Sequence, residues 1–278
     1  MEWVVYSKDN IPEYFSESLS NQNGKYNLME RLVFQIKENV FDDYYIAAVF
    51  NNNKIVAHIV HTPPYPVQIA ILVDADEVIQ FISKHLSDHN LSSRGIAGDK
   101  EMMEKLANKL YEDWHVNLNE GVFVCHEVIN EFKDVPGNTK IAQQEDEILL
   151  KEWYIAAMIE MDLEIELKYK NEQQIKATID GWIVNKLGQF WMKEEEPVSF
   201  VKFVPVQEYF AHVGMVYTPK AFRKNGYAAR NVALLTKQLL KTFKYTTLYT
   251  DLNNSTSNKI YKEIGYKQVA EFIQILPE

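Results

Sequence analysis

The sequence of 278 residues predicts an α/β (α+β) fold, with a mixed, mostly antiparallel central sheet flanked by helices. The first observation is the order of patterns in the second half, where helical periodicity gives way to a β-hairpin and then to alternating strands and helices. The second is a related outline in the first half. The third is an apolar content of 46%, which is ordinary for a globular protein and sufficient for a core.

The second half contains the clearer pattern. Apolar residues at helical spacing predict one helix that ends near Met161 and another over residues 172–185. Two β-rich runs around a charged turn predict a hairpin. The elements that follow are a strand at 211–218 with a bulge at Gly214, a helix at 227–243, a strand at 246–250, a helix at 255–264 that ends at Gly265, and a strand at 266–276.

The first half repeats this outline without obvious sequence identity, so we expect a duplicated topology. Its predicted helices and strands are a helix at 28–39, strands at 44–50, 55–60 and 67–73, helices at 77–86 and 100–114, and a strand at 122–128. Pro136 and Gly137 form a strong turn signal between the two patterned halves. The sequence therefore predicts two domains, residues 1–135 and 139–278.

Charge is distributed unevenly between the halves. Residues 1–138 hold 11 basic against 21 acidic residues, whereas residues 139–278 hold 18 of each. The stretch 209–250 contains no acidic residue at all. A net charge of −10 argues against nucleic acid as a partner, and the local positive field predicts a small anionic ligand. The lysines of the following helix also fit a solvated basic face.

Several classes of protein are disfavoured by what the sequence lacks. No apolar run approaches the ~18 residues of a membrane span, and the first residues do not resemble a signal peptide. The single cysteine, Cys125, lies in a run typical of a buried strand and allows no intrachain disulfide, so we expect a cytoplasmic protein without a membrane partner. His126-Glu-Val-Ile-Asn130 lacks the second histidine of a zinc motif, and we expect no metal.

The turn between the strand at 211–218 and the next helix carries the chemistry. Arg223-Lys-Asn-Gly226-Tyr-Ala228 places a glycine and a small residue where a strand enters a helix. The first amides of a helix lack partners, and the helix dipole adds roughly +0.5 charge there. Such a turn fits a pyrophosphate, with Arg223 and Lys224 as cationic donors at its edge. Taken alone, the pattern also fits an ordinary connection.

Two motifs resemble those of the GNAT acetyltransferase superfamily. Arg223-x-x-Gly226-x-Ala228 resembles the acyl-CoA signature Gln/Arg-x-x-Gly-x-Gly/Ala. Residues 250–266 resemble the second signature, Asn-x-x-Ala-x-x-Leu-Tyr-x-x-x-Gly-Phe, with Asn254 and Tyr261 in place and Ser257 instead of alanine. The resemblance covers about residues 139–278. The first half looks like the degenerate GNAT-like half of tandem members, and it lacks such a turn.

The resemblance implies an N-acetyltransferase that moves acetyl from acetyl-CoA to a primary amine of an unidentified small molecule or protein, in one ternary complex. It implies one acetyl-CoA per chain. Main-chain groups of the strand end would bind the pantetheine arm and polarise the thioester carbonyl. Tyr261 would protonate the departing thiolate. The implied cofactor-binding residues are Met215, Val216, Tyr217, Thr218, Arg223, Lys224, Asn225, Gly226, Tyr227, Ala228 and Asn254.

Some of these roles have alternatives. Asn254 also fits a pure helix cap, and Tyr261 also fits simple packing against a strand. The general base is not singled out, and the candidates are Asp251, His212, Glu160, Glu164 and water. A non-catalytic module that senses acyl-CoA through the same turn is the alternative function. An aminoacyl-tRNA-dependent transferase fits less well, because it would need a large basic groove. Monomer and homodimer both remain open.

Overall fold

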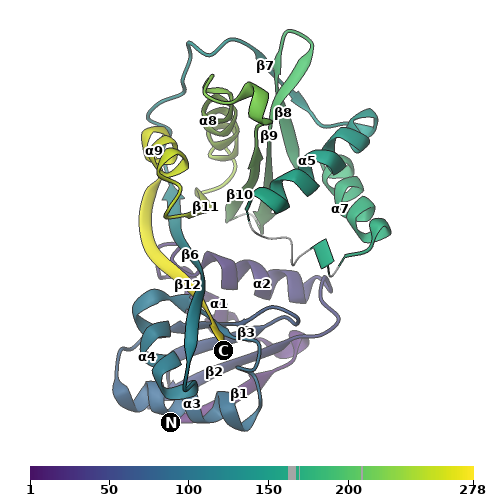
Figure 1. Ribbon diagram of the computed structural model, residues 1–278. Coiled ribbons are helices and arrows are strands. Elements are labelled where there is room, and N and C mark those ends of the chain that lie inside the picture. Colours follow the sequence, from purple (N-terminus) through teal and green to yellow (C-terminus); the bar gives the residue numbers. More distant parts are fainter. Residues whose placement is uncertain (162–166, 169, 208) are drawn as a thin grey trace. The chain divides into compact units, whose positions relative to one another are not determined.

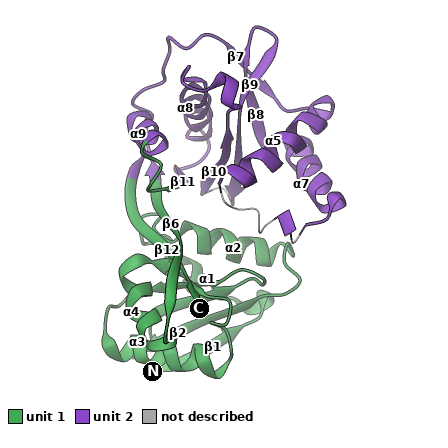
Figure 2. Cartoon of the chain, in the orientation of Figure 1, with its two compact units in different colours: residues 1–123, 249–255, 268–278 green, residues 124–248, 256–267 purple. Residues whose placement is uncertain are grey.

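The computed structural model describes residues 1–161, 167–168, 170–207 and 209–278. The chain forms two compact units (Figure 2). Unit 1 consists of Met1–Phe123, Tyr249–Ser255 and Gln268–Glu278, and unit 2 of Val124–Leu248 and Thr256–Lys267. This grouping differs from the predicted division at residues 135–139, because the last strand of the chain packs into unit 1. The division into two domains at that point stays a prediction.

Unit 1 is a sheet with helices on both faces (Figure 1). Its strands follow the order β1-β2-β3-β4-β5-β12-β6. β4 and β5 pair in parallel, and α3 lies between them in the sequence. The elements are β1 (Glu2–Tyr6), α1 (Glu13–Ser20), α2 (Asn27–Lys37), β2 (Tyr45–Asn51), β3 (Lys54–His61), β4 (Val67–Ile71), α3 (Asp76–Asp88), β5 (Ile96–Asp99), α4 (Lys100–Leu110), most of β6 (Trp114–Cys125) and most of β12 (Lys267–Pro277).

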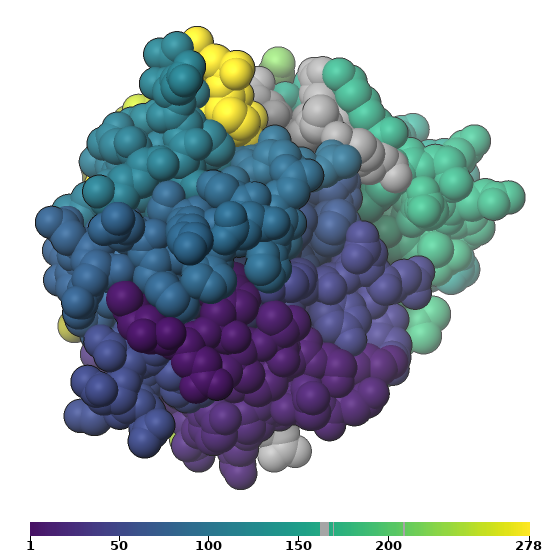
Figure 3. All heavy atoms as spheres, turned by 90° about the horizontal axis from the view of Figure 1, so that it is seen from below, coloured from purple at the N-terminus to yellow at the C-terminus, as the bar shows by residue number. Residues whose placement is uncertain are grey.

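The core of unit 1 follows from alternation along its strands. In β2, Ala47 and Val49 pack with α3 and α4, whereas Ile46 and Ala48 pack with α1 and α2. Because successive side chains of a strand point to opposite faces, a sheet covered on both sides needs such an unbroken apolar run. The first residues of the chain form part of the surface of this unit (purple in Figure 3), and Val5 in the edge strand β1 is 50% exposed.

The strands of unit 2 follow the order β11-β10-β9-β8-β7. All its neighbouring strands pair antiparallel except β10 and β11, which are parallel and separated in the sequence by α8. Among the strand pairings that the structure describes, each unit thus has one parallel pair joined by a helix. The elements are β7 (Asn138–Ile141), α5 (Glu147–Glu160), α7 (Glu172–Val184), β8 (Gly188–Lys193), β9 (Glu196–Val206), β10 (Phe210–Tyr217), α8 (Tyr227–Leu239), the first part of β11 (Tyr245–Asp251) and most of α9 (Ser255–Ile264).

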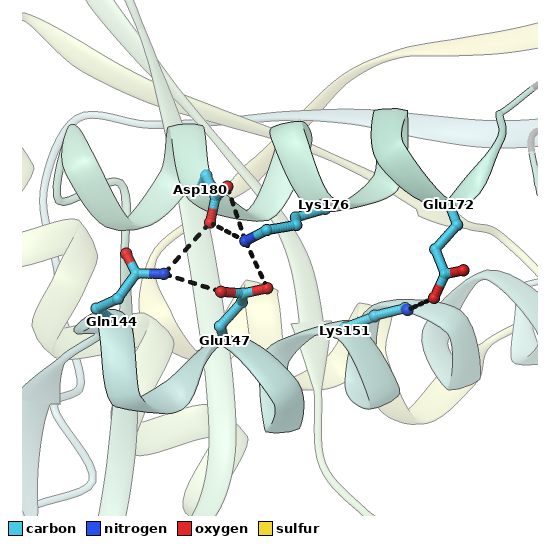
Figure 4. A network of polar contacts seen from close by, with 6 residues as sticks. All are labelled: Gln144, Glu147, Lys151, Glu172, Lys176 and Asp180. Atoms are coloured by element: carbon cyan, nitrogen blue, oxygen red, sulfur yellow. Dashed lines mark hydrogen bonds and ion pairs between the residues drawn. The ribbon is translucent and has the colours of Figure 1, made fainter.

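Helices α5 and α7 cover one face of this sheet and α8 the other. On β8, Phe190 packs with α5 and α7, whereas its neighbour Trp191 packs with Tyr227 of α8. A polar network also joins α5 to α7 (Figure 4). Nζ of Lys176 lies 2.7 Å from Oε1 of Glu147. The remaining members of the network are Gln144, Lys151, Glu172 and Asp180.

The predicted fold class is confirmed, and most element boundaries agree within a few residues. α9 spans the predicted 255–264, and the predicted bulge in β10 falls between Gly214 and Tyr217. One prediction was wrong: the helix expected over 100–114 ends at Leu110, because Trp114 already belongs to β6. The short strands β1, β5 and β7 were not predicted. β5 has only four residues and its pairing partners, β4 and β12, lie far away in the sequence.

Candidate functional site

The end of β10 separates from its parallel neighbour. The pairing with β11 joins Phe210–His212 to Tyr245–Thr247, yet β10 continues to Tyr217. The bulge shifts the register with β9, and Met215 has a φ of 47°, which is uncommon for a side chain of this kind. Beyond His212, β10 therefore has main-chain groups on its β11 side that the described parallel ladder does not use. An extended ligand could pair with them.

The turn after β10 is tight and requires a glycine. A short 3-10 turn at Lys220–Phe222 follows Pro219, and Lys224 then takes a left-handed φ of 65°. Gly226 precedes α8 with a φ of 78°. A Cβ at Gly226 would lie 2.9 Å from Cγ2 of Val135, closer than such atoms approach in proteins. Both the backbone angle and the space around this position therefore favour glycine, as the sequence predicts.

The start of α8 supplies main-chain donors. Arg230 donates its backbone N–H to the Gly226 carbonyl at 3.0 Å, and this is the first regular bond of the helix. The amides of Tyr227, Ala228 and Ala229 precede it and belong to the turn that has no helical acceptors. No acidic residue occurs between positions 209 and 250 of the sequence. The helix dipole at this end is therefore not offset by a nearby carboxylate in the same stretch, which favours an anion.

The Arg223 side chain spans the turn instead of extending freely from it. Its Nε donates to the carbonyl oxygen of Thr218 at 2.8 Å, and its Nη2 donates to Oε2 of Glu160, the last residue of α5. Asn225 braces the same loop, since its Nδ2 donates to the carbonyls of Phe222 and Arg223 at 3.1 and 3.0 Å. Lys224 is exposed. Of the two cations expected at the edge of the turn, Arg223 is held by protein groups.

Ser199 of β9 stabilises the junction between β10 and the turn, a role that the sequence did not predict. Its side chain is fully buried, and its Oγ donates to the carbonyl of Tyr217 at 3.2 Å while it accepts from Oγ1 of Thr218 at 3.0 Å. It thereby holds the last residue of β10 and the first residue of the turn together. The available signal was a lone hydroxyl in the apolar run Val198-Ser-Phe-Val201, where an inward-facing polar side chain needs a buried partner.

Two tyrosines flank the turn. Tyr227, the first residue of α8, is buried against Trp191 and Val198 and anchors the helix start. Tyr217 is half-buried and packs its ring 5.6 Å from that of Trp153 on α5. Burial raises the pKa of Tyr217, and the neighbouring negative charge of Glu160 raises it further. Val216 and Ala228 are both half-buried. The predicted residues from Met215 to Ala228 therefore form one continuous local structure.

The two residues of the second motif lie on separate units. Tyr261 is on α9 in unit 2, with its ring 6.1 Å from that of Tyr266. Burial raises the pKa of Tyr261 to about 12, so it stays a neutral phenol at physiological pH. Asn254 belongs to unit 1, in the turn between β11 and α9, and donates its backbone N–H to the Asp251 carbonyl at 3.0 Å. The role of Asn254 in the site stays a prediction.

The candidate general bases are mostly engaged elsewhere. Glu160 is paired with Arg223, and Asp251 accepts a bond from the Asn253 amide at 2.8 Å. His212 is buried and lies 3.1 Å from the hydroxyl of Thr247. Glu164 lies outside the described residues.

The part of the chain that the structure describes contains neither a cluster of metal-ligand side chains nor a membrane-spanning helix. Within residues 1–161, 167–168, 170–207 and 209–278, no three histidine, cysteine or carboxylate side chains gather as metal ligands would. No helix in these ranges combines the length and apolarity that crossing a bilayer requires.

Comparison with known proteins agrees with this geometry. The family profile described as "FR47-like protein" matches residues 198–273, which contain β10, the turn, α8 and α9. A GNAT-family acetyltransferase from Colwellia psychrerythraea is 13% identical, with a TM-score of 0.60 and 99% of each chain covered. A GCN5-related N-acetyltransferase from Sphaerobacter thermophilus is 8% identical, with a TM-score of 0.63 and coverage of 98% of this chain and 94% of that one.

A third solved structure has the tandem arrangement. It is described as a tandem GNAT protein from the clavulanic acid biosynthesis pathway, solved without AcCoA, and it is 9% identical with a TM-score of 0.54 over 99% of this chain and 97% of that one. A comparison with curated proteins finds no match. At such identities the solved structures establish the fold and not the activity. The chain has the fold of the GNAT acetyltransferase superfamily, and residues 198–273 match a GNAT-related family, as the motifs at Arg223 and Tyr261 predict.

Proposed function

We propose that this protein is an N-acetyltransferase that transfers acetyl from acetyl-CoA to a primary amine by direct attack in a ternary complex. The observation that carries the proposal is the turn at Arg223–Ala228. It combines a left-handed Gly226, a helix start with unpaired amides and a surrounding stretch without acidic residues. Together these features suit a diphosphate.

The residues at the end of β10 suit the rest of the cofactor. Acetyl-CoA would supply an acetyl group activated as a thioester. Main-chain groups of Met215, Val216 and Tyr217 lie beyond the end of the described β10–β11 ladder, where an extended pantetheine arm could pair with them. A backbone N–H there would stabilise the negative charge that develops on the thioester oxygen. The amides of residues 224–228 would bind the diphosphate.

Tyr261 would act on the leaving group. Its pKa of about 12 keeps the phenol protonated, so its O–H can donate a hydrogen bond to the sulfur that gains negative charge. A thiol has an ordinary pKa of ~8.5, so complete transfer of the proton to the thiolate would be uphill by ~3.5 pKa units. We therefore assign Tyr261 the role of a hydrogen-bond donor that shares its proton in the transition state.

The acceptor must lose a proton before it attacks, since an alkyl ammonium has a pKa of ~10.4. Glu160 and Asp251 already accept hydrogen bonds, and His212 is buried beside Thr247. Because these three candidates are engaged and Glu164 lies outside the described residues, we assign this proton to water. The acceptor is a primary amine of a small molecule or of a protein.

One experiment separates an enzyme from an acyl-CoA sensor. Acetyl-CoA binding is measured by calorimetry, and release of free CoA is then followed with a thiol-reactive dye in the presence of a panel of small primary amines and lysine-containing peptides. The protein's own thiol interferes little, because Cys125 is buried and burial raises its pKa to about 11. Amine-dependent release supports the enzyme. Binding without release for any amine supports the sensing module, and absence of binding contradicts both.

A further inference from the structure

The ion pair between Glu160 and Arg223 is unexpected next to a site for an anion. Glu160 is the last residue of α5, and Arg223 opens the turn before α8. A carboxylate at a helix C-terminus faces the negative end of the dipole, which disfavours it there. The same carboxylate would also repel the phosphates of acetyl-CoA. Two electrostatic arguments therefore disfavour Glu160 at this position, and its contact with Arg223 must be weighed against them.

Arg223 offers an explanation because its guanidinium serves two acceptors at once. Nε donates to the Thr218 carbonyl at 2.8 Å, which links the first and sixth residues of the segment 218–223. Nη2 donates to Glu160, so the same side chain also ties the turn to α5. The fork of an arginine suits such double use, because its donors lie in one rigid plane. A lysine at this position could not hold both groups in the same way.

Packed side chains around the Glu160–Arg223 ion pair further limit its movement. Tyr217 packs against Trp153 on α5, and the pKa of Tyr217 responds to both Glu160 and Arg223. Ser199 independently fixes the carbonyl of Tyr217. The side chains of Arg223 and Glu160 are 39% and 31% exposed, so the pair is only partly screened by water. The contact is thus part of a packed junction between α5 and the turn.

We infer, on the basis of the proposed function, that Glu160 is a positioning residue: it holds Arg223 on the Thr218 carbonyl and so fixes the turn whose main-chain amides bind the diphosphate. Glu160 then acts through Arg223 and is not the general base. Arg223 contributes mainly to the shape of the turn and less as a direct cationic contact to phosphate.

The direction in which Glu160→Ala changes acetyl-CoA affinity tests this inference. If Glu160 were only a nearby negative charge, Glu160→Ala would leave acetyl-CoA binding unchanged or tighten it by about twofold, since surface charges are screened at physiological salt. As a positioning residue, its loss should weaken binding by about five- to tenfold, in the range expected for a charge-assisted hydrogen bond that is partly exposed. Glu160→Gln keeps an acceptor oxygen and should lose only about two- to threefold.

The experiment measures the dissociation constants of acetyl-CoA and of 3′-dephospho-CoA for wild type, Glu160→Ala, Glu160→Gln, Arg223→Gln and the double variant Glu160→Ala/Arg223→Gln. Equal losses with both ligands assign the effect to the diphosphate region. The double variant should bind no more weakly than Arg223→Gln, because both changes release the same contact. Glu172→Ala is the matched control, since Glu172 forms a comparable ion pair with Lys151 between α5 and α7 (Figure 4) and should leave binding unchanged.

The possible results separate cleanly. Weaker binding by Glu160→Ala, with no additional loss in the double variant, supports the inference. Tighter or unchanged binding by Glu160→Ala, or additive losses, overturns it while the proposed function stands. A wild-type protein that binds neither ligand contradicts the proposed function itself. If Glu160→Ala does not fold, the graded loss in Glu160→Gln decides the question, with its melting temperature as the check on folding.

Discussion

Two connections in this protein have the same topology but differ in the charge and backbone conformation of the turn before the helix. β4 leads into α3 in unit 1, and β10 leads into α8 in unit 2, and each helix is followed by a strand parallel to the first. In unit 1 the connection is short, Ala75 precedes the helix in an extended conformation, and Asp76 and Glu77 open it. In unit 2 the connection is longer, and a left-handed Gly226 precedes α8.

The two connections also differ in the charges at the start of their helices. Asp74 lies before α3 and pairs with Lys105 at 2.6 Å. The positive end of the α3 dipole is therefore already compensated by carboxylates of the protein. The start of α8 has none in its first turn. Of the two crossovers, the one in unit 2 therefore better suits the proposed anion site. The fold is duplicated, and the predicted acetyl-CoA site is not.

The helices that follow show a second difference of this kind. Tyr261 is the seventh residue of α9, and the seventh residue of α4 is Leu106, which is fully buried in the core of unit 1. Leucine has no proton to donate, so unit 1 lacks the group proposed to assist the leaving thiolate. Unit 1 therefore has no counterpart of Gly226 before α3 and none of Tyr261 on α4.

The largest effect on the rate of the reaction is expected from Tyr261→Phe. Removal of a general acid typically costs 10²–10⁴-fold in rate, and we expect kcat to fall about 100-fold because the tyrosine shares its proton only in part. Acetyl-CoA affinity should stay unchanged, since the proposed contacts to diphosphate and pantetheine are main-chain groups. Steady-state kinetics and calorimetry on the same preparation provide both values. A variant with full activity would remove Tyr261 from the mechanism.

A buried histidine in each unit allows a test of packing. His58 on β3 is fully buried beside Ser18, at 2.8 Å, and His212 on β10 lies beside Thr247. Burial lowers the pKa of His58 to about 3. The folded state therefore favours neutral His58. The stability that this preference contributes to the free energy of unfolding is fully present above the unfolded pKa of about 6.5 and is lost as the pH falls toward 3.

The corresponding variant is His58→Gln, which keeps a partner for Ser18 and cannot titrate. Between pH 6.5 and 4, the free energy of unfolding of wild type should fall relative to the variant by about 1.4 kcal/mol per pH unit. Urea unfolding at several pH values measures this difference, and the comparison cancels the titration of Glu30 and Glu120, whose raised pKa values affect both proteins alike. A difference that does not change with pH would contradict the assigned burial of a neutral His58.

The smallest effect is expected from the acidic turn of unit 1. Asp74→Asn together with Asp76→Asn removes two charges, and acetyl-CoA affinity and stoichiometry should both stay within about twofold of wild type, because screened surface charges act weakly at a distance. Loss of the exposed pair with Lys105 should cost less than about 1 kcal/mol of stability. A second bound acetyl-CoA in this variant would show that charge alone separates the two connections.

Local residue chemistry predicted much of the fold and part of the site. The limits of α9, the bulge after Gly214 and the glycine before α8 all follow from short-range patterns. Gly226 was predictable because few other residues adopt its backbone angles without strain. The hairpin of β8 and β9 was equally clear, since its charged turn lies between two apolar runs.

Features that depend on distant residues could not be predicted. Glu160 and Arg223 are 63 positions apart, so no sequence spacing indicates their contact. The contribution of Ser199 needs the register of β9 against β10. The last strand supplies Ile273 and Ile275 to the core of unit 1, although it follows unit 2 in the sequence. Sequence periodicity identifies a strand but not its partner, and the predicted helix over 100–114 was too long for a related reason: the start of β6 is set by pairing.

On the proposed function, each chain binds one acetyl-CoA, and the turn before α8 binds it. Titration of the full chain with acetyl-CoA by calorimetry tests this directly, with Gly226→Val as the variant and Gly181→Ala as the control, because a Cβ at Gly181 meets no neighbour within 4 Å. We predict one site per chain for wild type and control. Gly226→Val should bind at least about 100-fold more weakly, since a β-branched residue at a φ of 78° is strained and its Cβ would clash with Val135. Two sites per chain, or unchanged affinity in Gly226→Val, would contradict the account.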